Sequence, residues 1–241
     1  MKPSSKRPAL LRELKNYLLF LKDYGYTEIP QQMELNLGAS KETSKSVLSP
    51  STPNNPGLLQ EVREELGDCT RCKLSEGRNK IVFGSGNPNA DLVFVGEGPG
   101  KDEDEQGFPF VGRAGKKLTE IIEKGMGLNR EQDTYICNIV KCRPPGNRDP
   151  EADEIAACKP FLLKQLQVIR PKVIVALGKP ASSTLLGRNV PITKERGTWH
   201  EFEGIKLMLT FHPAYLLRFY TLENRKAVHD DMKKVLEVLG K

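Results

Sequence analysis

Two groups of residues in this 241-residue chain have the types and the spacing that chemistry requires. The first is the glycine-rich turn Gly96–Gly100, which carries the carboxylate of Glu97 and directly follows the short apolar run Leu92–Val95. Three glycines and a proline in this turn let the backbone approach a ligand closely. Aromatic residues follow within Gly107–Gly112. A buried strand that brings a carboxylate, glycines and aromatic rings to one place predicts an active site.

Four of the five cysteines form the second group. Cys69 and Cys72 are separated by two residues, and Cys142 and Cys158 by fifteen. Four thiolates can close a tetrahedral zinc site or hold a [4Fe–4S] cluster, and a closely spaced pair can also be redox-active. The spacing alone does not choose among these alternatives. The fifth cysteine, Cys137, lies in an expected strand and is predicted to be a buried structural thiol.

Apolar runs that alternate with helical patterns must position these groups. Strands are expected at Leu92–Val95, Tyr135–Val140, Val173–Leu177 and Leu207–Phe211. Helices are expected at Leu58–Leu66, Ala114–Met126, Glu151–Ile169, Pro180–Leu186 and Leu222–Leu239. This alternation predicts an α/β fold with three layers, α/β/α, in which a central, mainly parallel four-stranded sheet is covered on both faces.

The polar residues that follow these strands support one site. The strand ends carry Gly96–Gly100, Asn138, Gly178–Pro180 and His212, in chain order. In parallel sheets, ligands bind at the carboxyl ends of the strands. Because all four segments fall on that edge, we expect them to converge on a single pocket.

The composition of the chain limits the kinds of partner and the cellular location that we expect. The net charge is +6, which favours an anionic partner, and no long basic tail accounts for it. A nucleic-acid surface would therefore have to be assembled by folding. We expect no membrane span, because no apolar run is long enough. Charged residues interrupt the apolar N-terminal residues, which argues against a signal peptide. The expected location is cytoplasmic, where cysteines more often bind metals than form disulfides.

Several motifs together resemble the family 4 uracil-DNA glycosylases, the iron–sulfur branch of that superfamily. The residues that carry the resemblance are Gly96–Gly100, Gly107–Gly112, Asn138 with Lys141–Arg148, and His212–Arg218. The resemblance covers about Leu58 to Leu239 and includes the spacing of the four cysteines. It implies hydrolysis of the N-glycosidic bond of deoxyuridine in DNA. It also implies a structural [4Fe–4S] cluster held by Cys69, Cys72, Cys142 and Cys158.

The resemblance further implies roles for residues in the pocket. Phe110 would stack on the flipped base, while Asn138 would pair with its Watson–Crick edge. His212 would stabilise negative charge on uracil O2, and Glu97 would hold the attacking water or stabilise the sugar cation. The residues expected to form the rest of the substrate pocket are Gly96, Gly98, Gly100 and Glu103.

Glu103 aligns with a family glutamate of the pocket wall and would exclude the methyl group of thymine. Its acidic neighbours Asp102, Asp104 and Glu105 are predicted to form a solvated loop. Contacts with DNA are expected from backbone N–H groups at helix starts, from nearby cations and from a segment that wedges into the base stack. The residues predicted for these contacts are Lys179, Ser182, Tyr215, Leu216, Leu217 and Arg218.

The N-terminal part of the chain lies outside the family resemblance. Residues 1–30 are predicted to form an amphipathic helical extension, 31–57 a flexible linker and 58–241 the glycosylase domain. Gln32–Leu37 resembles the short peptides by which bacterial repair proteins bind the replication sliding clamp. Its contact residues would be Gln32, Met33, Leu35 and Leu37. We expect a monomer that is associated with the nucleoid.

Three rival functions stay open at this point. One is the superfamily variant that traps uracil covalently on a histidine, although Lys141–Pro150 contains none. The second is an iron–sulfur redox or sensor protein in which nothing is hydrolysed. The third is a zinc-stabilised, catalytically silent DNA-binding module. Metal analysis and an activity assay separate them.

Overall fold

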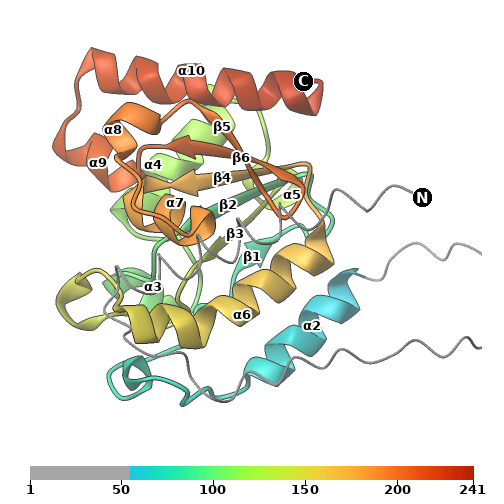
Figure 1. Ribbon diagram of the computed structural model, residues 1–241, viewed down its shortest axis with the longest axis vertical. Coiled ribbons are helices and arrows are strands. Elements are labelled where there is room, and N and C mark those ends of the chain that lie inside the picture. The colour runs from blue at the N-terminus through green and yellow to red at the C-terminus, as the bar shows by residue number, and fades with distance from the viewer. Residues whose placement is uncertain (1–54) are drawn as a thin grey trace, which may run out of the picture. The chain divides into compact units, whose positions relative to one another are not determined.

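A computed structural model of the chain describes residues 55–241 (Figure 1). The predicted N-terminal helix and the predicted clamp-binding residues lie outside this described part, as does the predicted linker up to residue 54. The first described helix, α2, spans Asn55–Leu66 and so begins three residues before the expected Leu58. Among the described residues, no helix is long and apolar enough to cross a membrane.

The centre of the structure is one six-stranded sheet with the strand order β1-β3-β2-β4-β6-β5. The four inner strands are parallel to one another and correspond to the four predicted apolar runs. They are β2 (Leu92–Gly96), β3 (Thr134–Asn138), β4 (Val173–Leu177) and β6 (Ile205–Thr210). The α/β class is therefore confirmed.

The predicted strand number of four is wrong, because an antiparallel strand is added at each edge. β1 has only two residues, Ser85–Gly86, too few to give a sequence pattern. β5, Trp199–Phe202, forms a hairpin with β6 through Glu203 and Gly204, both with positive φ. Three of the four β5 side chains remain at least partly exposed, so no buried apolar run marks this strand.

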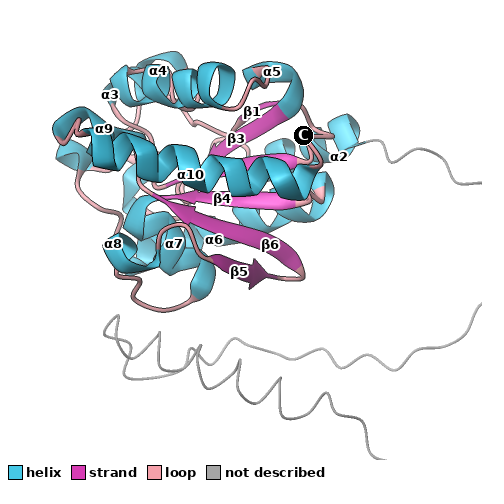
Figure 2. Ribbon diagram, turned by 90° about the horizontal axis from the view of Figure 1, so that it is seen from above, coloured by secondary structure: helices cyan, strands magenta, loops and turns pink. Residues whose placement is uncertain are grey.

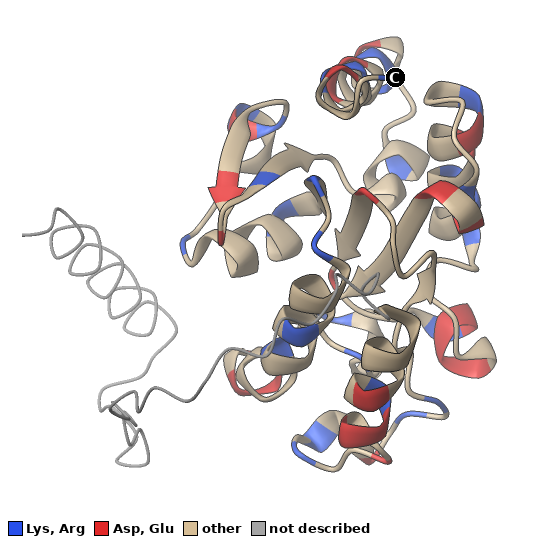
Figure 3. Cartoon of the chain, turned by 90° about the vertical axis from the view of Figure 1, so that its right-hand side faces the viewer, with Lys and Arg blue, Asp and Glu red and all other residues tan. Residues whose placement is uncertain are grey.

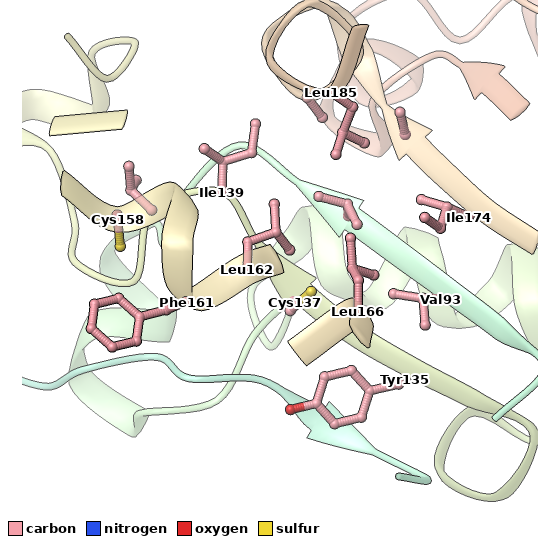
Figure 4. Close-up of a cluster of buried hydrophobic side chains, with 14 of the residues drawn as sticks. Val93, Tyr135, Cys137, Ile139, Cys158, Phe161, Leu162, Leu166, Ile174 and Leu185 are labelled. Carbon is pink, nitrogen blue, oxygen red and sulfur yellow. The ribbon is translucent and has the colours of Figure 1, made fainter. Parts of the chain in front are cut away.

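Helices cover both faces of the sheet (Figure 2). On one face, α6 (Ala152–Ile169) and α7 (Gly178–Leu186) pack against alternate residues of the parallel strands, and α2 packs against α6. Leu162 and Leu166 of α6 lie beside Val93 and Ile174 of the sheet (Figure 4). This burial fixes α6, and with it Cys158, against the sheet.

The other face is covered by α4 (Arg113–Glu120), a π-helical turn (Ile121–Gly125), α9 (Pro213–Arg218) and α10 (Leu222–Leu239). The expected helix Ala114–Met126 is thus divided into an α-helix and a π-helical turn. The remaining short helices include α5 (Arg130–Asp133) and α8 (Ile192–Glu195).

The acidic run after the glycine-rich turn forms the helix α3, Lys101–Gln106, instead of the predicted loop. Asp102 and Glu105 are exposed as expected, but the prediction is wrong for Asp104, which is buried. Its carboxylate accepts hydrogen bonds from the backbone N–H and the side chain of Asn79, at 2.9 and 2.6 Å. Asp104 therefore anchors α3 to the segment before β1 that contains Asn79.

Candidate active site

A pocket of about 430 Å³ lies at the carboxyl ends of the parallel strands. Gly96 and Asn138 pair in register at the ends of β2 and β3, and His212 follows β6. Two strand ends and the segment after β6 are thereby brought together. The predicted site residues that line the pocket are Glu97, Gly98, Gly100, Glu103, Phe110, Asn138, His212, Tyr215 and Arg218.

Asn138 lies at the floor of this pocket and is only 1% exposed. Its Oδ1 atom is the one buried side-chain nitrogen or oxygen of the described residues that has no hydrogen-bond partner. The strand end itself is held by Lys141, whose Nζ donates to the Asn138 carbonyl oxygen at 2.8 Å and to Gln165 Oε1 at 2.6 Å. Because the backbone of Asn138 is held in place and its Oδ1 acceptor is unpaired, this atom is suited to accept a hydrogen bond from a ligand.

Gly96 allows this floor to form. A Cβ atom at this position would lie 2.4 Å from Asn138 Oδ1 and 2.6 Å from Phe110 Cζ. Both distances are far shorter than van der Waals contact. The absence of a side chain at Gly96 therefore lets the amide and the ring share the pocket.

Gly96→Ala is expected to lower the free energy of unfolding by about 1–3 kcal/mol, because the added methyl group overpacks this floor. Denaturant unfolding measures the change. Gly77→Ala is the matched control, because a Cβ there meets no atom within 4 Å. Equal stability of the two variants would contradict the close packing of Gly96.

Phe110 is carried by a loop with a positive φ of 54° at Phe110 itself. Glu103 braces this loop, because its carboxylate accepts from the N–H groups of Val111 and Gly112 at 2.9 and 2.8 Å. The same carboxylate accepts from Gly100 N–H at 3.1 Å. Glu103 therefore joins the glycine-rich turn to the aromatic loop and fixes the Phe110 ring, whose centroid lies 5.7 Å from that of His212.

His212 caps the start of α9, where its Nδ1 accepts a hydrogen bond from the Ala214 N–H at 3.1 Å. A backbone N–H can only donate, so Nδ1 carries no proton and the proton of the neutral ring is on Nε2. Burial and the positive charge of Arg218 lower the pKa of His212 to about 4. The ring is therefore neutral near pH 7 and offers one N–H donor.

Glu97 lines the pocket together with Asp149. Burial raises the pKa of Glu97 to about 7, and the neighbouring negative charge of Asp149 acts in the same direction. Near neutral pH both the protonated and the ionised form of this carboxyl group are therefore populated, which is typical of groups in active sites.

One wall of the pocket, formed by the segment after β3, contains none of the predicted site residues. Pro144, Asn147, Arg148 and Asp149 line this wall, and Ala114 of α4 also lines the pocket. The motif Lys141–Arg148 contains most of these residues. Its turn-forming Pro-Pro-Gly-Asn sequence was the available signal for a loop at the site.

Some of the side chains that were predicted to contact DNA are exposed, and others are buried. Lys179 is exposed at the start of α7, and Leu217 is partly exposed on α9, but neither lines the pocket. The Ser182 side chain is buried and donates to the Gly178 carbonyl oxygen at 2.8 Å, while Leu216 is buried in the core. The side chains of Ser182 and Leu216 therefore do not reach a DNA strand in this structure.

A second cavity is lined by all four cysteines of the predicted cluster, Cys69, Cys72, Cys142 and Cys158. Cys137 is buried elsewhere in the core, as predicted. Within residues 55–241, no three His, Cys, Asp or Glu side chains are placed to hold one metal ion. The four thiols thus surround a common space without meeting at a single point.

Nitrogen donors point at the sulfur atoms of this cavity. Arg71 Nη1 lies 3.2 Å from Cys69 Sγ, and Arg78 Nη1 lies 3.7 Å from Cys142 Sγ. The Lys141 backbone N–H donates to Cys158 Sγ at 3.2 Å. Such donors favour sulfur atoms that carry negative charge.

Comparison with known proteins identifies the family. Residues 83–237 match the model of the uracil DNA glycosylase superfamily. A Thermotoga maritima protein named type-4 uracil-DNA glycosylase is 49% identical over 186 residues, which cover 76% of this chain and 96% of the relative. A Sulfurisphaera tokodaii protein of the same name is 45% identical over 188 residues, covering 75% and 84%. The chain therefore belongs to the type-4 branch of the uracil-DNA glycosylase superfamily.

Proposed function

We propose that this protein binds a uracil flipped out of DNA and hydrolyses its N-glycosidic bond, leaving an abasic site. The relatives that carry the name type-4 uracil-DNA glycosylase support this activity. The observation that carries the assignment to this pocket is the unpaired, buried Oδ1 of Asn138. Uracil supplies the missing donor through its N3–H.

Asn138 recognises the base through the two polar atoms of its side-chain amide. Oδ1 accepts from N3–H, and Nδ2 donates to O4 of uracil. Cytosine presents the opposite pattern, an acceptor at N3 and a donor at the 4-amino group, so it leaves the carbonyl oxygen and the NH2 group of Asn138 unpaired. A flipped amide would pair with cytosine instead, so this discrimination requires neighbouring atoms to hold the orientation of the amide. A buried polar group without a partner costs about 1–3 kcal/mol, and this penalty discriminates against cytosine.

Phe110 and Glu103 shape the space around the base. A base inside a duplex is unreachable, so the nucleotide must leave the stack and enter the pocket. The Phe110 ring provides a stacking face that its braced loop holds in place. Preorganisation of this loop reduces the ordering that base binding would otherwise require.

His212 acts on the leaving group. As the glycosidic bond breaks, its electrons pass to the uracil ring and negative charge develops on O2. The neutral His212 donates its Nε2–H to O2, and the Ala214 N–H holds the ring by Nδ1. The sugar becomes an oxocarbenium-like cation that water then attacks from the opposite side.

Glu97 acts on the sugar side of the reaction. Its carboxylate orients the attacking water and stabilises the positive charge of the sugar. A strong base is unnecessary, because the cation is already highly electrophilic. Only the ionised form of Glu97 performs either role.

The rate of uracil release is expected to rise as the pH increases through about 7, because Glu97 ionises above its raised pKa. Glu97→Gln removes this dependence and lowers the rate. Asp149→Asn moves the rise to lower pH, since it removes a negative charge beside Glu97. His212 adds no dependence near pH 6.5, because its pKa is lowered to about 4. Single-turnover rates across pH measure the profiles, and an unchanged profile in Glu97→Gln would contradict the assignment.

The DNA strand is held at the mouth of the pocket by α9. Arg218 is exposed and lines the pocket, where it can pair with a phosphate group next to the flipped nucleotide. Tyr215 lies beside it and stacks on Phe219, with 4.9 Å between the ring centroids. These aromatic residues are suited to fill the space that the flipped base vacates.

The four thiols that line the cysteine cavity are the donor set that a [4Fe–4S] cluster requires. Each of the four thiols would bind a different iron, which matches thiols that surround a space without meeting at one point. Burial raises the pKa of Cys142 to about 11, so metal binding must displace a proton from this thiol. The cluster would join the loop of Cys69 and Cys72 to Cys142 and Cys158, which flank the pocket wall.

Purified protein is expected to contain about four irons and four acid-labile sulfides per chain, because each cluster thiol takes one iron. Elemental analysis with sulfide determination and visible absorption spectroscopy measures this content. Cys158→Ser is expected to lower the content sharply, whereas Cys137→Ser serves as the control. Stoichiometric zinc in place of iron would overturn the cluster assignment.

Base release from a labelled oligonucleotide with one uracil tests the function. The expected result is alkali-labile cleavage at the uracil and none at a cytosine in the same sequence. A stable protein–DNA adduct would instead support covalent trapping. DNA binding without base release by cluster-loaded protein would support a sensor or a silent binding module.

A further inference from the structure

A second groove of about 340 Å³ lies between α4, the π-helical turn and α10. Its floor is apolar and includes Leu216 and Met232. Basic side chains form much of the remainder, namely Lys117, Lys124 and Arg225. The acidic Glu120 also lines the groove and pairs with Lys117. The lining cations outnumber this one carboxylate.

Two of these cations converge on the ring of Tyr220. Lys117 Nζ lies 5.0 Å from the ring centroid and the Arg225 guanidinium carbon lies 4.7 Å from it. Lys117 comes from α4 and Arg225 from α10, so the tertiary fold places one cation from each helix against the same ring. Held on this ring, the two cations give the groove a positive charge that favours an anion.

Tyr220 is 57% exposed, so this arrangement stands at the surface of the protein. Charged side chains of both signs occur along α10, the helix that ends at the C-terminus (Figure 3). The groove differs from the remaining surface of α10 because its floor is apolar. An anion with an attached apolar group, such as a phosphodiester and its deoxyribose, matches both features.

The groove and the active-site pocket are separated by one short helix. α9 supplies Tyr215 and Arg218 to the active-site pocket and Leu216 to the groove. Tyr220 follows α9 by two residues. A DNA strand with its uracil in the active-site pocket can therefore cross α9 and reach the groove.

We propose that this groove binds a backbone phosphate of the strand that contains the uracil, through Lys117 and Arg225 held on Tyr220. The inference rests on the proposed glycosylase function and extends it to a second contact. It predicts a contact with the sugar-phosphate backbone that is independent of base sequence.

The width of α9 sets which phosphate is bound. A helix with its side chains is about 10–12 Å across. Phosphates of one DNA strand follow each other about every 3.4 Å along the axis, so this width corresponds to about three nucleotides from the uracil. The binding is expected on one side of the uracil only.

Neutral methylphosphonates, introduced one position at a time on both sides of the uracil, locate the contact. One position about three nucleotides away should lower kcat/KM on the order of tenfold in the wild type. The same replacement should have little effect in Arg225→Met, because the contact is already lost. The rate at saturating protein should stay unchanged, since the groove acts on binding.

Lys226→Met is the matched control, because Lys226 is an exposed cation of α10 that does not line the groove. Arg225→Met, unlike this control, should reduce the slope of log kcat/KM against log salt by about 1. Tyr220→Leu should resemble Arg225→Met, whereas Tyr220→Phe should behave as wild type because it keeps the ring.

Three results have different meanings for the two proposals. If wild-type protein releases uracil but no methylphosphonate position loses its effect in Arg225→Met, the phosphate site is overturned while the glycosylase function stands. If wild-type protein releases no uracil from unmodified DNA, the proposed function itself fails. An equal loss in Arg225→Met and Lys226→Met would also overturn the site, because it would report overall charge alone.

Discussion

His212→Ala is expected to slow uracil release about 10²–10³-fold at saturating protein, the loss that follows removal of one preorganised donor to a developing negative charge. In the proposed mechanism the neutral ring donates Nε2–H to O2 of the leaving base, and alanine offers no donor in its place. Because the interaction strengthens as the bond breaks, the loss should appear in the chemical step more than in DNA binding. Single-turnover kinetics and a separate binding titration measure the two effects.

His200→Ala is the control for this change. His200 lies on the edge strand β5, and its Nε2 interacts with Thr198 rather than with the pocket. It should release uracil at the wild-type rate. A wild-type rate that falls steeply as pH rises through about 6.5 would contradict the neutral donor, because a protonated histidine would then be required.

Asn138→Asp is expected to reduce kcat/KM for uracil about 10²–10³-fold near neutral pH. The carboxylate has the same shape as the amide and still accepts from N3–H. It cannot donate to O4, and its negative charge repels this oxygen in a buried site. Loss of a donor together with repulsion corresponds to about 3–4 kcal/mol.

A rescue at low pH distinguishes this account from a damaged fold. Once protonated, the aspartic acid regains a donor for O4, so activity should recover as the pH falls, relative to wild type. Asn147→Asp is the control, because it places the same charge at an exposed position of the same pocket. If Asn147→Asp loses as much activity as Asn138→Asp, general repulsion between the added charge and DNA explains both.

The sequence predicted the elements whose pattern is local. The four apolar strands, and the helices Leu222–Leu239 and Glu151–Ile169, have burial patterns that a few neighbouring residues reveal. The edge strand Trp199–Phe202 has no such pattern, because only one of its residues is buried. Asp104 shows the same limitation, since its burial depends on Asn79, which is distant in the sequence.

The location of the pocket could be predicted from the sequence, but its hydrogen bonds and protonation states could be predicted only in part. Rules for strand ends brought Gly96, Asn138 and His212 together correctly in space, but the fourth expected segment, Gly178–Pro180, does not line the pocket. The protonation state of His212 depends on its bond with the Ala214 N–H, which no spacing reveals. Likewise, the effect of Asp149 on Glu97 arises only when the loop after β3 folds over the turn after β2.

The strand order of the sheet also determines the sequence of events during synthesis of the chain. β2 pairs with β3 and β4, and β4 pairs with β6, so each parallel pairing must wait for a later segment. The four cysteines of the proposed cluster precede β4, whereas His212 follows β6. A nascent chain therefore contains every proposed cluster ligand before it contains a complete pocket. Fragments that end before His212 would retain these cysteines and remain unable to release uracil.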